Sequence, residues 1–406
     1  HRQHDITVYE AANYVGGHVN TIEVHEDHQS IAVDTGFIVF NDWTYPHFEK
    51  LLSSLDVQVQ NSEMSFSAQC EATDFEWSGN GLRGLIFNKE NWNQYKAYQL
   101  FFDVLRFNKT AKEYLASDES NQTLGEFLAK NKFSETFIQN YLVPMGAAIW
   151  SSEPREINKF PAKSFLTFFN HHGLLNLKDR PQWKTIVGGS KQYVKELIKP
   201  FINKVHLNTP VERVKRVAQR VEIFARGRKP EYFDHVFIAC HSDQALKLLD
   251  QPTKDESIVL SNIRYQANTA VLHTDPSLMP RRKRAWSSWN YHITEQDSED
   301  VKVTYYMNRL QNLSIKQDYF VTLNLDEKID STKIIKKINY SHPIFDRSAI
   351  KSQKQHALVN GTQNTWYCGA YWRNGFHEDG VWSAIQSVEQ FTTLVGYEEL
   401  YLQRAS

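Results

Sequence analysis

The sequence predicts an α/β protein in which a parallel-sheet domain is interleaved with an α+β domain of antiparallel strands and helices. Three observations predict this class. A short strand-forming run at 6–9 ends in the acidic Glu10 and is followed by a pair of glycines. A continuous apolar run at 235–240 suits a buried parallel strand. Four segments between 269 and 323 alternate in polarity, which is typical of antiparallel strands.

The N-terminal run predicts a nucleotide site. An acidic residue that closes a strand, here Glu10, holds ribose hydroxyls in dinucleotide sites, with a glycine-rich phosphate loop about 20 residues earlier. Only nine residues precede Glu10, so we expect the first strand, the GxGxxG turn and most of the first helix to be absent from this chain. Gly16 and Gly17 allow close approach of the backbone to a phosphate. With Thr21 they favour a flavin site; the alternatives are an exposed glutamate and a plain tight turn.

The other elements follow from hydrophobic spacing and from capping or breaking residues. Thr123 is expected to cap a helix through Leu128, and Pro161 to interrupt the helical block that contains it. No repeat or low-complexity linker separates the segments, so the two domains should alternate along the chain. We expect a hairpin at 21–24 and 31–34, a helix at 43–55, strands at 64–70 and 73–77, a mostly helical block from 92 to 176, a helix after Ser190, strands at 205–207, 211–217 and 221–224, a helix from Ser242, and strands at 269–273, 285–292, 301–307 and 320–323.

The C-terminal part repeats the pattern of a strand, a glycine and a helix. Residues 365–370 are expected to form a buried strand that runs into Gly369, and apolar residues from Val381 to Phe391 recur at helical spacing. Asp379 is the expected N-cap and Gly380 opens the first turn. The N-terminus of that helix would stabilise an anionic flavin ring or a diphosphate. The alternative is an ordinary capped helix.

Composition excludes several classes of protein. The 406 residues are 41% hydrophobic and 23% charged, as in an ordinary globular chain, and 46 basic against 47 acidic residues exclude a dedicated nucleic-acid binder. Three cysteines without CxxC spacing exclude a disulfide scaffold and a zinc ribbon, and the sixteen histidines show no metal-binding spacing. We expect no metal, no membrane-spanning helix and no signal peptide, and hence a cytoplasmic protein.

Longer motifs identify a family resemblance. They lie at 33–41, 63–67, 144–152, 179–183, 187–190, 234–243, 285–292 and 375–380. On these motifs the chain resembles the bacterial NAD/FAD-binding proteins of the flavin-containing amine oxidase and protoporphyrinogen oxidase superfamily, along nearly its whole length. Two positions depart from the family pattern, the absent GxGxxG loop and Ser383-Ala384 in place of Ser-Gly.

The resemblance implies a Rossmann-like FAD-binding domain, lacking its N-terminal part, at 1–60, 181–262 and 357–406, and a substrate domain at 61–180 and 263–356. It also implies roles for individual residues. Glu10 would hold the adenosine ribose, the backbone of Val211 the adenine, and residues 373–377 would face the flavin ring. The other expected cofactor residues are Gly16, Gly17 and His18 at the diphosphate, Thr21 beside them, Gly36 and Phe37 at the ring, and Gly369, Asp379, Gly380 and Val381 at the ribityl and flavin end.

The implied activity is that of an FAD-dependent oxidoreductase, which moves a hydride from a C–H bond of a small or lipid-like, acyl-chain substrate to flavin N5. Such chemistry needs no dedicated acid or base, and no catalytic residue is assigned. Substrate candidates are Trp286, Trp289, Tyr291 and His292, with packing of aromatic side chains under helices as the alternative.

Two other functions stay open on the sequence. One is a flavin-free scaffold that binds a lipid or a partner enzyme, which the absent phosphate loop favours. The other is an NAD(P)-dependent reductase without flavin. The basic run at 281–284 gives either a solvated turn or a contact with anionic lipid headgroups, peripheral to the inner membrane. Phe165, Phe168, Phe169, Leu174 and Leu175 could add to that contact or pack in a core.

Overall fold

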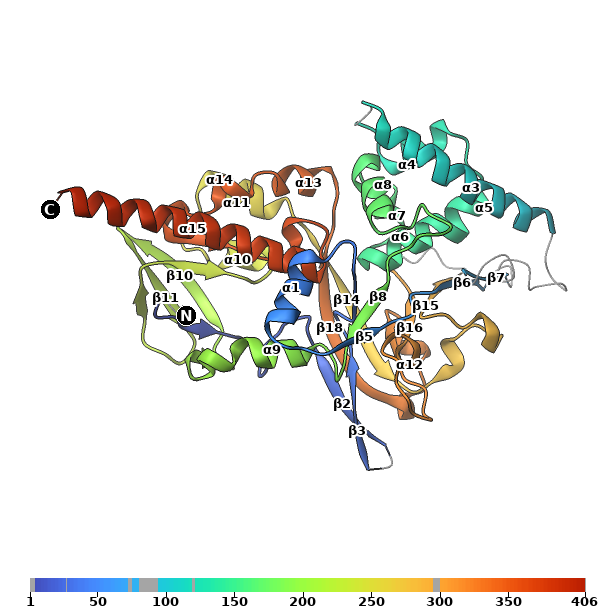
Figure 1. Cartoon of the computed structure of the whole chain (residues 1–406), viewed down its shortest axis with the longest axis horizontal. Coiled ribbons are helices and arrows are strands. Elements are labelled where there is room, and N and C mark those ends of the chain that lie inside the picture. The colour runs from blue at the N-terminus through green and yellow to red at the C-terminus, as the bar shows by residue number, and fades with distance from the viewer. Residues whose placement is uncertain are drawn as a thin grey trace.

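The computed structural model describes residues 4–26, 28–71, 75–79, 94–118, 121–294 and 300–405. Its centre is a seven-stranded sheet, with a group of helices at one end of the molecule and a long C-terminal helix at the other (Figure 1). The strand order is β18 (Ile334–Pro343), β14 (Tyr265–His273), β17 (Phe320–Leu323), β16 (Val303–Tyr306), β15 (Trp289–Ile293), β6 (Phe66–Cys70) and β7 (Phe75–Ser78).

This sheet contains the expected antiparallel strands, but β18 was not expected, and β14 begins at Tyr265, four residues earlier than expected. β15 pairs parallel with β6, Trp289 lying opposite Phe66, while its other neighbour β16 is antiparallel. β15 also begins four residues later than expected, because 283–285 form a 3₁₀ turn. After that turn the backbone N–H of Ser287 donates to the side chain of Asn290, so this segment is a loop.

Helices cover the sheet on one side and share its largest core. Phe107, Phe127, Phe165 and Phe169 are fully buried there. Thr123 and Glu126 form a capping box at the start of α4, as expected for a Thr-x-x-Glu pattern. The helices are α3 (Gln94–Ala116), α4 (Leu124–Lys130), α5 (Glu135–Phe137), the π-helical turn η1 (Ile138–Leu142), α6 (Val143–Trp150), α7 (Pro154–Ile157) and α8 (Ala162–His171).

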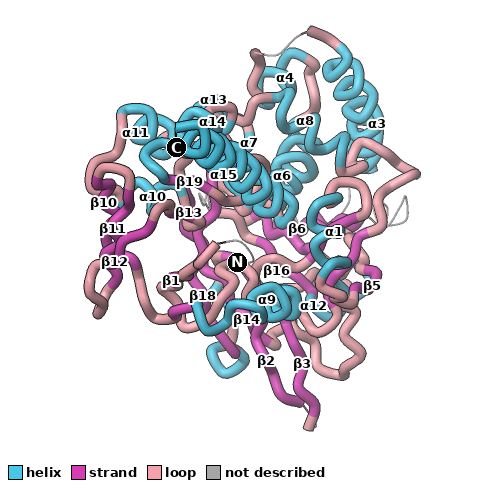
Figure 2. Tube along the Cα trace, turned by 60° about the vertical axis from the view of Figure 1, so that its left-hand side comes forward, coloured by secondary structure: helices cyan, strands magenta, loops and turns pink. Residues whose placement is uncertain are grey.

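The parallel strands form two short pairs. β1 (Val8–Tyr9) pairs with β9 (Val205–His206), and β13 (Val236–Ile238) pairs with β19 (Thr365–Tyr367). Tyr9 and Val236 pack against one hydrophobic cluster, which joins the two pairs into one domain. The N-terminal half of the long helix α15 (His377–Ala405) lies over β13 and β19 (Figure 2). The flanking elements are the sheet of β10 (Val211–Val217), β11 (Arg220–Ala225) and β12 (Glu231–Phe233), with α10 (Ser242–Leu248), α11 (Lys254–Ser261), α13 (Arg347–Gln353) and α14 (His356–Val359).

A third group of elements lies between these two parts. The hairpin of β2 and β3 projects from the molecule, as expected (Figures 1 and 2). Phe40, Phe48 and Tyr193 pack in a separate small core. The elements are β2 (Thr21–Glu26), β3 (Gln29–Asp34), β4 (Val39–Asn41), α1 (Pro46–Ser54), β5 (Val59–Asn61), β8 (Trp183–Ile186), α9 (Lys191–Ile198) and the 3₁₀ segment η2 (Lys199–Lys204).

The start of α15 corrects one expectation. The helix begins at His377, so Asp379 is its third residue and not its N-cap. Its carboxylate reaches back to accept the backbone N–H groups of Phe376, at 2.9 Å, and Asn374, at 3.2 Å. The position thus supplies the acidic half of a capping arrangement, one turn further into the helix than expected.

Other expectations about element boundaries are confirmed only in part. The helix expected at 43–55 begins at Pro46, where the fixed φ of proline suits a first turn. Thr73 and Trp92, at the edges of expected elements, lie outside the described residues. No described helix is both long and apolar enough to cross a bilayer. The four domain boundaries stay a prediction.

Candidate cofactor site

Glu10 lies at the carboxyl end of β1, as expected. Its backbone N–H donates to the carbonyl of His206 at 2.9 Å, and its Oε1 accepts the N–H of Ala12 at 2.8 Å. The Glu10 carbonyl in turn accepts the N–H of Thr209, two residues before Val211, at 2.8 Å. The fold therefore brings Glu10 and the start of β10 together, although 200 positions separate them.

The glycine pair forms a turn with one crowded and one open side. Gly16 has a φ of +130°, and a Cβ there would lie 2.6 Å from the carbonyl oxygen of Val19. Gly17 has a φ of +58°, and a Cβ there would meet nothing within 4 Å among the described atoms. A side chain at position 16 would therefore clash within the turn, while the absence of a side chain at Gly17 leaves room for another molecule to approach.

His18 links this turn to the segment at 36–37. Its carbonyl accepts the N–H of Phe37 at 2.9 Å, and a Cβ on Gly36 would lie only 2.0 Å from that same oxygen. The imidazole stacks on Tyr340 at 4.8 Å, with His342 at 5.4 Å and His241 at 5.7 Å between ring centroids. Its Nε2 is buried and has no hydrogen-bond partner among the described atoms.

The imidazoles of this cluster are held neutral. Desolvation lowers the pKa of His18 to about 4, and the neighbouring His241 adds to the effect. Desolvation likewise lowers the pKa of His342 to about 3. A neutral ring with an unpaired nitrogen can accept a proton or a hydrogen bond from whatever approaches the turn.

Phe37 connects these residues to the start of α15. Its ring lies 4.5 Å from the ring of His377, which stacks on Phe48 at 4.4 Å. Val381 packs in the same small core as Phe37, and a Cβ on Gly380 would meet nothing within 4 Å among the described atoms. The contacts thus bring together two expected parts of the site that are 340 positions apart in sequence.

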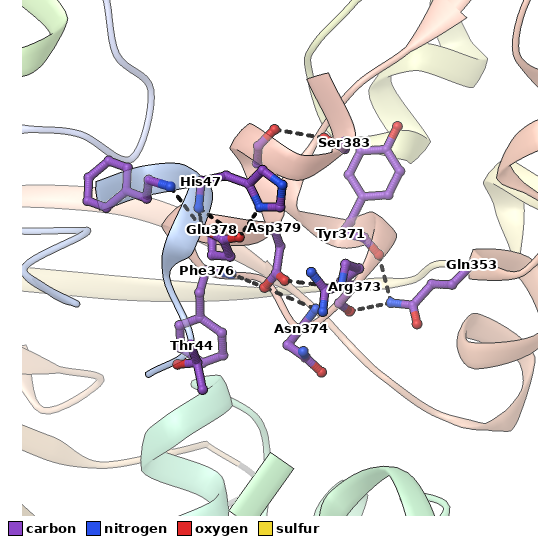
Figure 3. Close-up of polar contacts among 12 residues, drawn as sticks. Thr44, His47, Gln353, Tyr371, Arg373, Asn374, Phe376, Glu378, Asp379 and Ser383 are labelled. Atoms are coloured by element: carbon purple, nitrogen blue, oxygen red, sulfur yellow. Dashed lines mark hydrogen bonds and ion pairs between the residues drawn. The ribbon is translucent and has the colours of Figure 1, made fainter. Parts of the chain in front are cut away.

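Glu378 fixes α15 to α1 (Figure 3). Its Oε2 accepts the backbone N–H of Phe48 at 2.9 Å and of His47 at 3.0 Å, and its Oε1 lies 2.5 Å from Nδ1 of His47. The N–H groups at the start of a helix lack partners within it, so this buried carboxylate caps α1 from another element. This contact was not predictable from the sequence, because the two elements lie more than 300 residues apart.

Gly369 and Asp379 are held by short-range contacts near the same helix. The N–H of Gly369 donates to Oγ of Ser383 at 2.9 Å. The Nε of Arg373 lies 3.7 Å from the Asp379 carboxylate. Burial raises the pKa of Asp379 to about 6, although its backbone donors and Arg373 oppose the shift.

Asp34 is a buried residue of the site that the sequence analysis missed. It accepts hydrogen bonds from the hydroxyl of Thr21 at 2.5 Å and from both the N–H and the hydroxyl of Ser190. Thr21, an expected cofactor residue, is therefore engaged in an internal network. An aspartate inside the apolar run at 31–39 was the signal that could have identified it.

The four substrate candidates do not share one surface. Successive residues of a strand face opposite sides of the sheet, so Trp289 and Tyr291 point one way and His292 the other. Tyr291 is in the main core, and His292 bonds Thr304 and Gln69. Trp286 is buried in a separate small cluster. A role for any of the four in substrate binding stays a prediction.

A cavity of about 490 Å³ was also missed. It lies between α8, the C-terminal end of α13 and the segment that leads into α15, and Phe168, Phe376 and Asp379 are among its lining residues. Ser164, Thr167, Phe168, His171 and His172 line it from one face of α8, a helical spacing that the sequence displays. Phe168 is buried here, and Phe165, Phe169 and Leu175 are buried as well, which makes core packing their use.

In the described part of the chain, the cysteines and the potential metal-binding side chains do not form a reactive or metal-binding site. Its three cysteines are free, and burial raises the pKa of Cys240 to about 12, so its thiol is not activated as a nucleophile. No group of three or more potential ligands among His, Cys, Asp and Glu occurs in these residues.

The chain is similar to known proteins at two levels. The family described as flavin containing amine oxidoreductase matches residues 1–309. No curated protein matches the sequence significantly.

Among solved structures, putrescine oxidase bound to putrescine is 13% identical with a TM-score of 0.63, covering 95% of this chain and 93% of that one. A CLA-producing fatty acid isomerase from P. acnes is 15% identical with a TM-score of 0.66, covering 95% and 92%. Cyclohexylamine oxidase from Brevibacterium oxydans is 14% identical with a TM-score of 0.62, covering 95% and 94%. At these identities the likeness shows a shared fold.

Proposed function

The chain belongs to the family of flavin-containing amine oxidoreductases and is an FAD-dependent oxidoreductase, and from this premise we propose that it oxidises a C–H bond of a small or lipid-like, acyl-chain substrate. FAD, when bound, supplies the ring whose N5 accepts the hydride. The observation that carries the proposal is the contact chain His18, Phe37 and His377, which joins the glycine turn to the start of α15.

The residues present fit a flavin dinucleotide. Gly17 and Gly380 both face open space, one at each end of that contact chain. The Nε2 of His18, next to Gly17, is buried without a hydrogen-bond partner among the described atoms, as expected for a group whose partner is a ligand. The start of α15 presents positive dipole charge, which favours a cofactor that carries a diphosphate and becomes anionic on reduction.

Each residue has a binding task in this proposal. The carboxylate of Glu10 accepts a ribose hydroxyl, oriented by its bond from Ala12. Gly16, Gly17 and His18 surround the diphosphate, and Gly36 and Phe37 lie against the ring. The backbone of Val211 contacts the adenine, and Gly369, Asp379, Gly380 and Val381 hold the ribityl and flavin end.

The site's own residues exclude water and set the local charge. Phe37, Phe48 and the buried His377 enclose the start of α15 in apolar surface, and desolvation lowers the pKa of His377 to about 3. His377 is therefore neutral and adds no charge. Asp379, whose pKa burial raises to about 6, is ionised at neutral pH and can hold a proton in mildly acidic solution.

Contact with a lipid surface is part of the proposal as the means of reaching a lipid-like substrate. On α3, Tyr98 and Phe102 are 57% and 62% exposed, and Leu177, in the loop after α8, is 62% exposed. Exposed large apolar side chains of this kind support a membrane-facing surface. The basic run at 281–284 supports it less, because Lys283 lies over the ring of Trp286 and the backbone of Arg281 bonds Glu76.

The test is the visible absorption spectrum of the purified protein before and after incubation with FAD. We expect a flavin band that survives gel filtration. Gly380→Val fills the open space at the start of α15, so it should abolish retention, while Gly396→Val on the same helix, where a Cβ also meets nothing within 4 Å, should not.

Folded protein without a flavin band in either condition would contradict the proposal and favour the flavin-free scaffold. Nicotinamide consumption without flavin would favour an NAD(P)-dependent reductase. Full flavin retention by Gly380→Val would place the cofactor away from α15.

A further inference from the structure

The cavity of about 490 Å³ lies directly beside the start of α15. Its volume lies within the range of small-molecule sites. Asp379, one of its lining residues, also belongs to the expected cofactor site, so the cavity adjoins the place where the ribityl and flavin end would be held. The inference that this is a substrate cavity rests on the proposed function. Its preference for one kind of ligand rests on the charged side chains that line it.

The acidic groups of the cavity are engaged within the protein. Glu378 caps α1 and contacts His47, and it is only 5% exposed. Asp379 is 3% exposed and is bound by the backbone of Asn374 and Phe376. Neither carboxylate is therefore available to pair with a cationic ligand at the cavity mouth.

The basic groups are more accessible. Lys163 at the start of α8 and Lys354 after α13 both line the cavity, and the ammonium group of neither makes a hydrogen bond or an ion pair with the described residues. Arg373, 42% exposed, also lines it, and its guanidinium lies 3.7 Å from Asp379. His171 is exposed at the same wall. The lining thus carries three cations against two carboxylates that are engaged within the protein, and this excess of positive charge repels a cation and attracts an anion.

The inner wall is apolar. The rings of Phe168 and Phe376 stack with centroids 5.4 Å apart, and Ile350 and Tyr45 complete this side. A ligand that fits both parts has a hydrocarbon body and an anionic end.

We propose that this cavity binds an amphipathic carboxylate, with the carboxylate at Lys163 and Lys354 and the hydrocarbon chain against Phe168 and Phe376. An alkylamine, the type of substrate that the family name suggests, is then disfavoured by the same two lysines. We choose a carboxylate because it is the anionic end of the acyl-chain substrate in the proposed function, and each lysine supplies a point charge that attracts it.

The test compares three probes of equal chain length, decanoate, decylamine and decyl phosphate, by isothermal titration of the purified full chain. We expect decanoate to bind at least about tenfold more tightly than decylamine, a ratio that falls with added salt. Lys163→Gln combined with Lys354→Gln should weaken decanoate binding by about tenfold or more. The matched control is Lys351→Gln combined with Lys336→Gln, two exposed lysines outside the cavity, which should leave it unchanged.

Several results would overturn the inference. Decylamine binding as tightly as decanoate, no binding of either, or unchanged decanoate binding in the cavity variant would each do so. Tighter binding of decyl phosphate would overturn the carboxylate assignment. A flavin spectrum of each sample separates the two proposals: decanoate binding without flavin contradicts the proposed function alone, and flavin with a preference for decylamine contradicts this inference alone.

Discussion

Ser190, the residue before α9, donates its backbone N–H and its hydroxyl to the carboxylate of Asp34, at 2.9 and 3.0 Å. Thr21 donates a third hydrogen bond to the same group. The fully buried carboxylate thus joins the hairpin after the glycine turn to a helix more than 150 residues away. Burial nevertheless outweighs these donors and raises the pKa of Asp34 to about 6.

The first prediction concerns pH and stability. A carboxyl whose folded pKa lies above its ordinary 3.8 binds protons more strongly in the folded state, so stability falls as pH rises from about 4 to about 6. We expect Asp34 to account for about 3 kcal/mol of this fall. Asp34→Asn cannot ionise and should lose this part of the slope in urea unfolding between pH 4 and 7. Asp326→Asn, at a partly exposed position, should keep it, and an unchanged slope in Asp34→Asn would contradict the prediction.

The second prediction concerns two glycines of the site. In Gly36→Ala the new Cβ meets the carbonyl oxygen of His18 at 2.0 Å, so the two segments must separate. We expect a loss of about 1–3 kcal/mol in the free energy of unfolding. Gly17→Ala meets no atom within 4 Å and should cost about 1 kcal/mol or less, from its left-handed backbone alone. Its larger effect should be on flavin affinity. Equal stability losses in the two variants would contradict the prediction, because they would show that the protein accommodates a Cβ at Gly36 without a stability cost from the clash with His18.

The third prediction concerns a buried ion pair. Glu256 has no exposed surface, and its carboxylate lies 2.6 Å from the guanidinium of Arg216. It also accepts a hydrogen bond of 2.6 Å from the hydroxyl of Tyr367, which lies two positions before Gly369. Glu256→Gln removes the charge and leaves the guanidinium uncompensated, which should cost about 3 kcal/mol or more. Arg216→Met combined with Glu256→Met should recover most of that loss. Thermal and urea unfolding measure both, and a double variant as unstable as the single one would contradict the prediction.

The fourth prediction concerns His18 and flavin affinity. Its pKa is lowered to about 4 in the free protein, and an adjacent diphosphate would favour the protonated ring. FAD binding should therefore tighten as pH falls from 8 to 5.5, because binding and protonation are linked. Quenching of flavin fluorescence measures the affinity.

His18→Gln keeps a polar side chain that cannot titrate and should remove this pH dependence. His241, His342, Tyr340, Tyr265 and Asp243 also face the cluster, so His342→Gln is the matched variant. A pH slope that persists in His18→Gln and vanishes in His342→Gln would assign the proton to His342.

Local chemistry made several elements predictable from sequence. Thr123 and Glu126 have the spacing of a capping box, and the structure forms it. The apolar run at 235–240 predicted a buried parallel strand; β13 pairs parallel with β19, but it covers only Val236–Ile238, and Phe237 is 40% exposed. These features depend on neighbours in sequence, so a single chain displays them.

Features that depend on distant residues were missed or misplaced. The α15 start moved from Asp379 to His377 because the carboxylate reaches back to a turn held by the rest of the fold. Glu378 was unremarkable in sequence, yet it caps α1 from more than 300 residues away. Trp289 and His292 were both named as substrate candidates, but strand geometry places them on opposite faces of the sheet.

The sequence by itself determined the class of the protein, its family and the segments that hold glycine turns and capped helices, because periodicity and local hydrogen bonding are encoded by adjacent residues. Only the tertiary structure decided which of these segments meet. It placed Phe37 between His18 and His377, buried Asp34 against Ser190, and brought Lys163 and Lys354 into the lining of one cavity with Phe168 and Phe376. Burial and the balance of charge across a cavity are properties of residues brought together from separate elements, and no stretch of sequence contains them.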